Sequence, residues 1–176
     1  NSTYRPLLPV RWVAVAYVEI FRRIPFLVIL FIVLFVIEPL MPGTSLFGIA
    51  TVSVCLLSTA FLSEVIRAGI ESVPAPQVES ARTLNFNWLQ IQISVVLPQS
   101  WKVILPPTAA FIVMFIKDTS LASQLGVIEL TFAGKMLVNR GFSPVLGFGA
   151  ILICYFALSY PLSRLAARLE KRLANS

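Results

Sequence analysis

Two short polar groups interrupt an otherwise apolar chain of 176 residues, and they are its candidates for chemistry. The first runs from Glu79-Ser80-Ala81-Arg82 to Asn85, and Leu97-Pro98 follows twelve residues later. The second begins at Lys117-Asp118-Thr119-Ser120 and includes Glu129. Carboxylates and hydroxyls can accept hydrogen bonds from cationic ligands or partners. The chain has no histidine, which removes the commonest general base and most zinc sites. The two groups therefore favour binding over catalysis, and for the first we favour docking to a soluble partner.

The composition indicates that a membrane is the solvent. Hydrophobic residues make up 57% of the chain and charged residues 12%, against about a quarter charged in soluble domains. Cys55 and Cys154 each lie in an apolar run without a CxxC pattern, so we expect two buried, apolar side chains. The net charge of +6 comes from basic residues that flank apolar runs, which is typical of membrane orientation and not of nucleic-acid binding. We predict no metal, cofactor or nucleic-acid site.

Hydropathy predicts one transmembrane domain over residues 1–176 with four spans. We place the spans at residues 24–41, 46–66, 99–116 and 141–163. The third is the weakest, because Val103 to Ile116 supplies fourteen uncharged residues where about twenty are expected. It must therefore borrow residues from the segment after Pro98.

The distribution of Lys and Arg predicts the orientation. Eleven basic residues fall at the two ends and in the middle loop, and three fall elsewhere. The eleven are Arg5, Arg11, Arg22, Arg23, Arg67, Arg82, Lys102, Arg164, Arg168, Lys171 and Arg172; the three are Lys117, Lys135 and Arg140. The positive-inside rule then places both ends in the cytoplasm of a multi-pass inner-membrane protein. We expect the basic, amphipathic stretch 162–173 to anchor at the membrane surface.

The loop at residues 74–93 is too ordered for a simple connection. Apolar residues recur at helical spacing after two prolines, and Asn85 is able to end a helix in the left-handed region. Asn87 and Gln90 have the spacing of a capping box that starts a second helix. The pattern predicts a helix, a sharp break and another helix on the cytoplasmic face.

The stretch from Lys117 to Arg140 is polar at its start and is interrupted by Gly126 and Gly134 later. It is too polar for a span that faces lipid and too patterned for a free loop. Irregular backbone at membrane depth must be buried in protein or line water. We therefore expect a re-entrant or cavity-lining segment.

At these residues the chain resembles the permease subunits of polar amino acid ATP-binding cassette importers. The cytoplasmic loop of that family, often called the EAA loop, reads Glu-Ala-Ala, three residues, Gly, nine residues, Ile-x-Leu-Pro. The matching positions here are Glu79, Ala81, Val95, Leu97 and Pro98. Two positions depart from the motif, since Ser80 replaces an alanine and Asn85 replaces the glycine. Asn tolerates the left-handed region better than other non-glycine residues, so the turn is expected to survive with some strain.

Further segments are similar to the same family in the same order along essentially the whole chain. They are Glu19 to Pro25, Leu97-Pro98-Gln99 leading to Leu105-Pro106-Pro107, Lys117 to Ser123, and Gly126 to Leu130. Members of the family usually have another span before the position of Arg5. The resemblance therefore implies that this chain lacks an N-terminal span.

The resemblance implies an all-α bundle of the type I importer permease fold, with a cytoplasmic coupling helix. Its partners would be ATPase subunits, a second permease that is the same or different, and a periplasmic or lipoprotein solute-binding protein. The ATPase-coupling residues would be Glu79, Ser80, Ala81, Asn85, Leu97 and Pro98. The chain has no phosphate-binding Gly-Lys-Ser/Thr loop, so ATP hydrolysis is expected on another chain. The alternative for Glu79 is an exposed face with a weak Glu79–Arg82 pair.

We expect the translocation path to include Asp118, Thr119, Ser120 and Glu129, because ionisable groups near membrane depth are usually functional. Asp118 would meet a substrate ammonium. Alternatively, Lys117 and Asp118 mark the outer membrane boundary, or Asp118 caps the next helix. Some relatives carry a polar or acidic residue where Phe111 stands here, so a strongly cationic substrate is less expected.

Two other classes of protein are weighed against an importer subunit. A membrane enzyme would need a paired nucleophile and base, and the lack of histidine argues against one. An ATP-independent carrier or channel for small polar solutes would show inverted halves or rings of charge. No internal repeat is visible in the chain.

Overall fold

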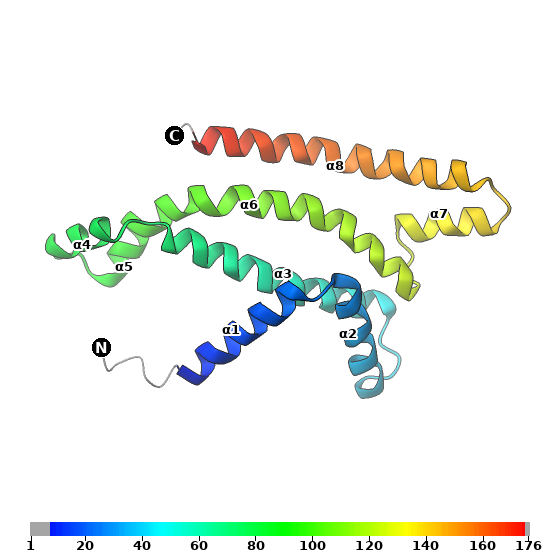
Figure 1. The fold of residues 1–176 in the computed structure, drawn as a ribbon, viewed down its shortest axis with the longest axis horizontal. Helices are drawn as coiled ribbons and strands as arrows, with labels where there is room; N and C mark the ends of the chain where they lie inside the picture. Colours follow the sequence, from blue (N-terminus) through cyan, green and yellow to red (C-terminus); the bar gives the residue numbers. More distant parts are fainter. Residues whose placement is uncertain (1–7, 175–176) are drawn as a thin grey trace. The chain divides into compact units, whose positions relative to one another are not determined.

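A computed structural model describes residues 8–174, and all regular secondary structure in that part of the chain is helical (Figure 1). This confirms the predicted all-α class. The α-helices are α1 (Leu8–Arg23), α2 (Phe26–Leu40), α3 (Leu46–Glu71), α4 (Ala75–Thr83), α5 (Trp88–Ile91), α6 (Leu97–Asp118), α7 (Leu130–Asn139) and α8 (Pro144–Ala174). A π-helix, η2 (Gln92–Val96), precedes α6, and a 3₁₀-helix, η3 (Thr119–Leu125), follows it.

The chain forms two compact units. The first unit consists of Asn1–Phe61 and Asp118–Cys154, and the second of Leu62–Lys117 and Tyr155–Ser176. The two polar groups that the sequence singles out therefore belong to different units. Residues 79–98 lie in the second unit, and residues 118–129 lie in the first.

Three helical stretches are long and apolar enough to cross a membrane, which identifies the chain as membrane-spanning. They are Leu46–Glu71, Trp88–Leu125 and Pro144–Leu173. Only 22%, 17% and 6% of their most apolar windows are buried within the chain, so most of this surface is left for lipid or partner subunits. The weakest predicted span, at 99–116, proves to be part of a continuous 38-residue helical stretch.

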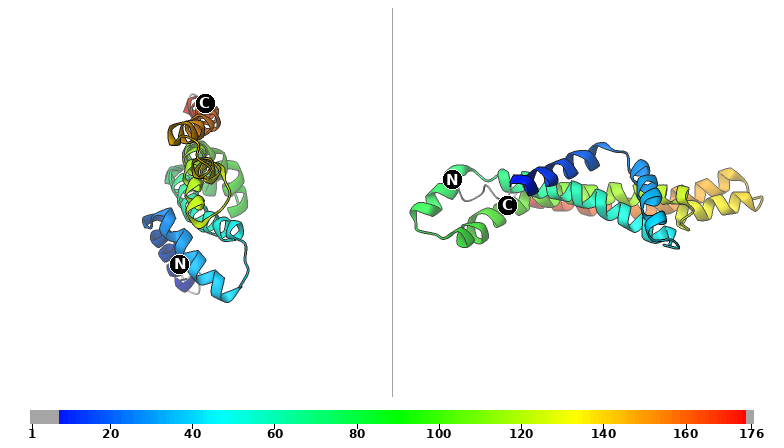
Figure 2. Two further views of the ribbon diagram at one scale, coloured as in Figure 1. Left: turned by 90° about the vertical axis from the view of Figure 1, so that its right-hand side faces the viewer. Right: turned by 90° about the horizontal axis from the view of Figure 1, so that it is seen from below.

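Residues 24–41 do not form a straight span. Helix α2 has 15 residues, so it extends about 22 Å, short of a hydrocarbon core of about 30 Å. It meets α1 at a bend of 118°. The change of direction between the two helices is visible in Figures 1 and 2. Pro25 occupies the N-cap position of α2, and a proline disfavours helical backbone at the preceding Ile24. The bend follows from this restriction, and hydropathy alone does not detect it.

The core of the first unit joins α1, α2 and α3. Ile29 and Val33 of α2 are buried with Ile49 in the first turn of α3. Phe21 and Ile24 pack against this cluster, and the Tyr17 hydroxyl donates to the carbonyl oxygen of Leu56 at 2.5 Å. Helix α1 therefore lies against α3 within the unit.

This packing corrects the charge count. Arg22 and Arg23 follow Phe21 directly, so they lie beside the start of α3 and not at its opposite end. If Arg22 and Arg23 are counted on the other side of the membrane, the count of basic residues changes from eleven against three to nine against five. The excess stays on the side predicted to be cytoplasmic. Arg5 lies outside the described residues.

Two further expectations were wrong. Cys55 and Cys154 are both exposed rather than buried. The stretch 162–173 is not a separate surface helix, since α8 continues without a break from Pro144 through Pro161 to Ala174.

The second unit depends on a close approach between α3 and α6 at Gly69. A β-carbon built at Gly69 would lie 2.3 Å from Ile104 Cγ1 and 3.2 Å from the backbone oxygen of Ser100. Ser100 is completely buried at this contact. Only a glycine allows the two helices to pack this closely.

We therefore expect Gly69→Ala to destabilise the protein by about 1–3 kcal/mol, the usual cost of overpacking a filled interface. Thermal unfolding in detergent measures the loss. Gly149→Ala is the matched control, because a β-carbon there meets nothing within 4 Å. Equal stability of the two variants would contradict the close α3–α6 contact.

Candidate functional site

The first candidate group is carried by the short helix α4 in the second unit (Figure 1). Pro74 holds the N-cap position, and Glu79 and Ser80 are exposed near the middle of the helix. The Ser80 hydroxyl donates to the carbonyl oxygen of Pro76 at 2.8 Å. Ala81 is buried and contributes to a small core with Ile91 and Val96. Glu79 is therefore exposed on α4, and Ala81 packs the helix against α5 and η2.

Asn85 ends α4 in the left-handed conformation, as predicted. Its φ is +61°, and it is the one non-glycine residue with positive φ among residues 8–174. The Phe86 N–H donates to the Ala81 oxygen at 3.1 Å, and the Asn85 N–H donates to the Arg82 oxygen at 2.9 Å. These two bonds form a Schellman motif, which satisfies the last carbonyls of the helix. The turn that a glycine usually makes is therefore intact with asparagine.

The predicted capping box starts the next helix. The Asn87 side chain accepts from the Gln90 N–H at 2.9 Å, and the Gln90 side chain accepts from the Asn87 N–H at 2.8 Å. Together with the break at Asn85, this confirms the helix–break–helix pattern.

The join between α5 and α6 is a π-helix that sequence reasoning missed. The Leu97 N–H donates to the Gln92 oxygen, five residues back. Pro98 has no N–H, so an α-helical bond to the oxygen of Ser94 is impossible. The Gln99 side chain donates instead to the neighbouring oxygen of Val95 at 2.9 Å. Pro98 was the available signal, because π-bulges often form where the regular ladder is interrupted. Leu97 and Pro98 thus lie where this segment enters α6.

An apolar surface follows Glu79 on the same segment, and we call it the 84–93 patch. It consists of the exposed side chains of Leu84, Phe86, Trp88, Leu89 and Ile93. Leu84 is 71% exposed and Trp88 70% exposed. Within residues 8–174, Glu79 and Arg82 form no ion pair, so the weak pair considered from the sequence is not made. A rigid segment with one free carboxylate and an apolar surface suits docking to another protein.

The second candidate group begins where α6 ends, in the first unit. Asp118 retains helical backbone, and its side chain makes no capping hydrogen bond, so the interpretation of Asp118 as a cap was wrong. Thr119 and Ser120 form the first turn of η3 and are half-buried. A 3₁₀-helix repeats every three residues, so Ser120 and Ser123 lie in line on one face.

Glu129 has a structural role that the sequence did not reveal. It is the N-cap of α7, and its carboxylate accepts from the Thr131 N–H at 2.8 Å and the Phe132 N–H at 2.7 Å. Gly126 makes the preceding turn with φ of +92°. The negative charge is also favourable at a helix N-terminus. Glu129 therefore fixes the start of α7.

Lys135 is a second residue that sequence reasoning did not select. Its ammonium donates to the Ser123 hydroxyl at 3.0 Å and so connects α7 to η3. Ser123 is only 5% exposed. The available signal was a lysine within a largely apolar stretch, where charge is costly.

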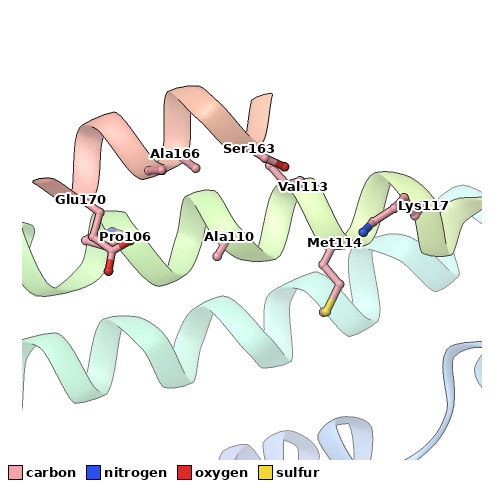
Figure 3. Close-up of a pocket in the computed structure, with 9 residues that line it drawn as sticks. Pro106, Ala110, Val113, Met114, Lys117, Ser163, Ala166 and Glu170 are labelled. Carbon is pink, nitrogen blue, oxygen red and sulfur yellow. The ribbon is translucent and has the colours of Figure 1, made fainter. Parts of the chain in front are cut away.

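A groove of about 300 Å³ lies between α6 and α8 in the second unit (Figure 3). Figure 3 shows Glu170 beside Pro106, and Ser163 beside Val113. Small apolar side chains such as Ala110 and Ala166 form much of its wall. Lys117, at the start of the second polar group, lines the groove, but Asp118, Thr119, Ser120 and Glu129 do not, and no residue of the first group does.

The fold and the two segments define a membrane-spanning transport subunit. The family model for the binding-protein-dependent transport system inner membrane component matches residues 4–175, and the chain belongs to this family. It is a transport component and not an enzyme.

Curated relatives and a solved structure agree with this assignment. The probable glutamine ABC transporter permease protein GlnM of Bacillus subtilis is 31% identical over 168 residues, which cover 96% of this chain and 78% of the relative. The L-cystine transport system permease protein TcyB of Bacillus subtilis is 34% identical over 166 residues, covering 94% and 71%. The crystal structure of an amino acid ABC transporter with histidines superposes with a TM-score of 0.87 at 26% identity, covering 98% of this chain and 78% of that chain.

The left-handed Asn85 generates a direct prediction. Asn85→Gly should keep the Schellman bonds, and Asn85→Ala should weaken them by about 1 kcal/mol, because a β-carbon is unfavourable in this region. Hydrogen exchange of the Phe86 amide, followed by mass spectrometry in detergent, measures the difference. Arg82→Ala is the control, since it removes an exposed side chain at a helical position. Equal protection in the Asn85→Ala and Asn85→Gly variants would show that the turn does not depend on this conformation.

Proposed function

We propose that this chain is the permease subunit of an ATP-driven importer that passes polar amino acids across a bacterial inner membrane. The relatives named for glutamine and L-cystine, and the amino acid transporter of known structure, support this substrate class. ATP hydrolysis would take place on a separate subunit, to which the permease is coupled through the segment around Glu79.

The observation that carries the proposal is the construction of this segment. A Schellman turn at Asn85 and a capping box at Asn87 fix two short helices, and the 84–93 patch stays exposed. Exposed apolar side chains near one free carboxylate match the anchors of a protein interface. Glu79 would meet a basic group of the ATPase in a charge-assisted hydrogen bond. Ser80 and Ala81 would help to hold Glu79 in position on α4. Ser80 bonds to the oxygen of Pro76, and Ala81 packs against Ile91 and Val96.

The docking segment is joined to the membrane part of the chain by continuous helix. The stretch Trp88–Leu125 includes α5, η2, α6 and η3, with Leu97 and Pro98 near its start and Asp118, Thr119 and Ser120 near its end. Movement of the ATPase would therefore reach the translocation residues through this stretch.

We assign the substrate ammonium to Asp118, whose carboxylate is not used in capping. Thr119 and Ser120 would add hydroxyl contacts, and Glu129 would act indirectly by fixing α7. Phe111 is buried and stacks on Phe115 with ring centroids 5.0 Å apart. An apolar side chain at this position favours neutral or zwitterionic substrates over strongly cationic ones.

The charge count of nine against five supports cytoplasmic ends and a cytoplasmic Glu79 segment. The large exposed apolar area of the spanning helices supports assembly with a second permease subunit, either the same or a different one. Delivery of the substrate by a solute-binding protein follows from the family description.

The test is co-purification of the chain with its ATPase subunit, followed by uptake in proteoliposomes. We expect Glu79→Arg to lower ATPase recovery by tenfold or more, because loss of a charge-assisted pair and its replacement by repulsion cost roughly 1.4 kcal/mol or more. Gln77→Arg is the matched control, because Gln77 is exposed on another face of α4.

Wild-type uptake should require ATP. Uptake without ATP, or ATPase recovery that ignores the Glu79→Arg change, would favour the ATP-independent carrier instead.

A further inference from the structure

We propose that Lys135 and Ser123 form a carboxylate-binding point for the substrate in the first unit. This inference rests on the proposed import of amino acids, and it adds a second recognition group to Asp118. An amino acid carries both an ammonium and a carboxylate, so a path that holds it benefits from one acidic and one basic group.

The geometry of the pair is well defined. Lys135 is half-buried on α7, and its Nζ donates to Ser123 Oγ at 3.0 Å. Ser123 is 5% exposed and lies on η3, so the bond spans two elements that pack together. The ammonium is therefore held in place, which lowers the entropy cost of binding a ligand.

The charge of Lys135 is not matched within the described chain. A lysine ammonium has three donors, and here one of them meets a neutral hydroxyl. Lys135 takes part in no ion pair that residues 8–174 show. The carboxylate of Glu129 on the same helix accepts from the Thr131 and Phe132 amides.

A neutral donor would connect α7 to η3 just as well, without the cost of a charge at a half-buried position. A cation that keeps two further donors is suited to an anionic ligand. The contact between α7 and η3 explains why residue 135 donates a hydrogen bond to Ser123. It does not explain why that donor carries a positive charge.

The position of the pair agrees with the substrate assignment. Ser120 and Ser123 lie in line on the 3₁₀-helix, and Asp118 immediately precedes it. One short segment thus carries the carboxylate proposed for the ammonium and the serine that holds Lys135. The bound carboxylate could come from the backbone end of any amino acid or from an acidic side chain, and the same experiment separates the two sources.

The experiment measures equilibrium binding to the detergent-purified permease–ATPase complex, without the solute-binding protein. Competition by glutamine, its α-amide glutaminamide and glutamate gives a dissociation constant for each. We expect Lys135→Gln to weaken binding of the carboxylate ligand by roughly tenfold or more, the usual effect of losing a charge-assisted hydrogen bond. Lys135→Arg should retain most of the affinity. Arg140→Gln is the control, because Arg140 is an exposed cation at the C-terminal end of α7.

The decisive readout is a ratio of affinities, which a purely structural role of Lys135 would not change. If the α-carboxylate is bound, the preference for glutamine over glutaminamide should collapse in Lys135→Gln. If a side-chain carboxylate is bound, the preference for glutamate over glutamine should collapse instead. Ser123→Ala keeps the charge of Lys135 and should therefore reduce the affected affinity ratio less than Lys135→Gln does. Ser123→Ala provides the test if Lys135→Gln fails to fold.

Unchanged ratios in both Lys135→Gln and Ser123→Ala would overturn the inference. If Asp118→Ala lowers affinity while these ratios stay unchanged, amino acid binding by the permease stands and only the role of Lys135 fails. A wild-type complex that binds none of the three compounds would contradict the proposed function as well.

Discussion

Every backbone N–H and C=O group within a lipid bilayer needs a partner inside the protein, and the architecture of this chain depends on that constraint. Continuous helix meets the requirement, so the long stretches Leu46–Glu71, Trp88–Leu125 and Pro144–Leu173 are helical from end to end. Each interruption must then supply replacement partners locally. The carboxylate cap at Glu129 is one such solution. The Schellman bonds at Asn85 and the capping box at Asn87 likewise give local partners to the helix ends of the segment around Glu79.

The interruptions are also where the candidate functions lie. The break between α4 and α5 gives two short helices with an exposed apolar surface, which is the proposed docking element. The 3₁₀-helix η3 places hydroxyls next to the carboxylate of Asp118 in one short segment, and Ser123 of that segment contacts Lys135 of α7. The π-helix before Pro98 lies on the helical stretch between these regions along the chain. The long helices form the membrane-spanning scaffold, and the candidate polar groups lie where the helices are interrupted.

The sequence predicted the features that depend on local chemistry. Asn85, Asn87 and Gln90 act on neighbours within five residues, so their turn and cap could be derived without a structure. The three long apolar helices needed only composition. The bend between α1 and α2 was missed because hydropathy counts apolar side chains and ignores the backbone restriction before Pro25. The Lys135–Ser123 bond joins residues twelve apart on different helices, and the exposure of Cys55 depends on which faces pack, so both required the tertiary structure.

The central claim is that the 84–93 patch lies against the ATPase subunit in the assembled transporter. A photo-crosslinking phenylalanine derivative in place of Trp88, an exposed aromatic residue, tests this contact directly. The same group in place of Val145, which is 80% exposed on α8, provides the comparison. We predict that the Trp88 position cross-links to the ATPase and that the Val145 position does not. An active transporter in which the Trp88 position gives no cross-link to the ATPase would contradict the account.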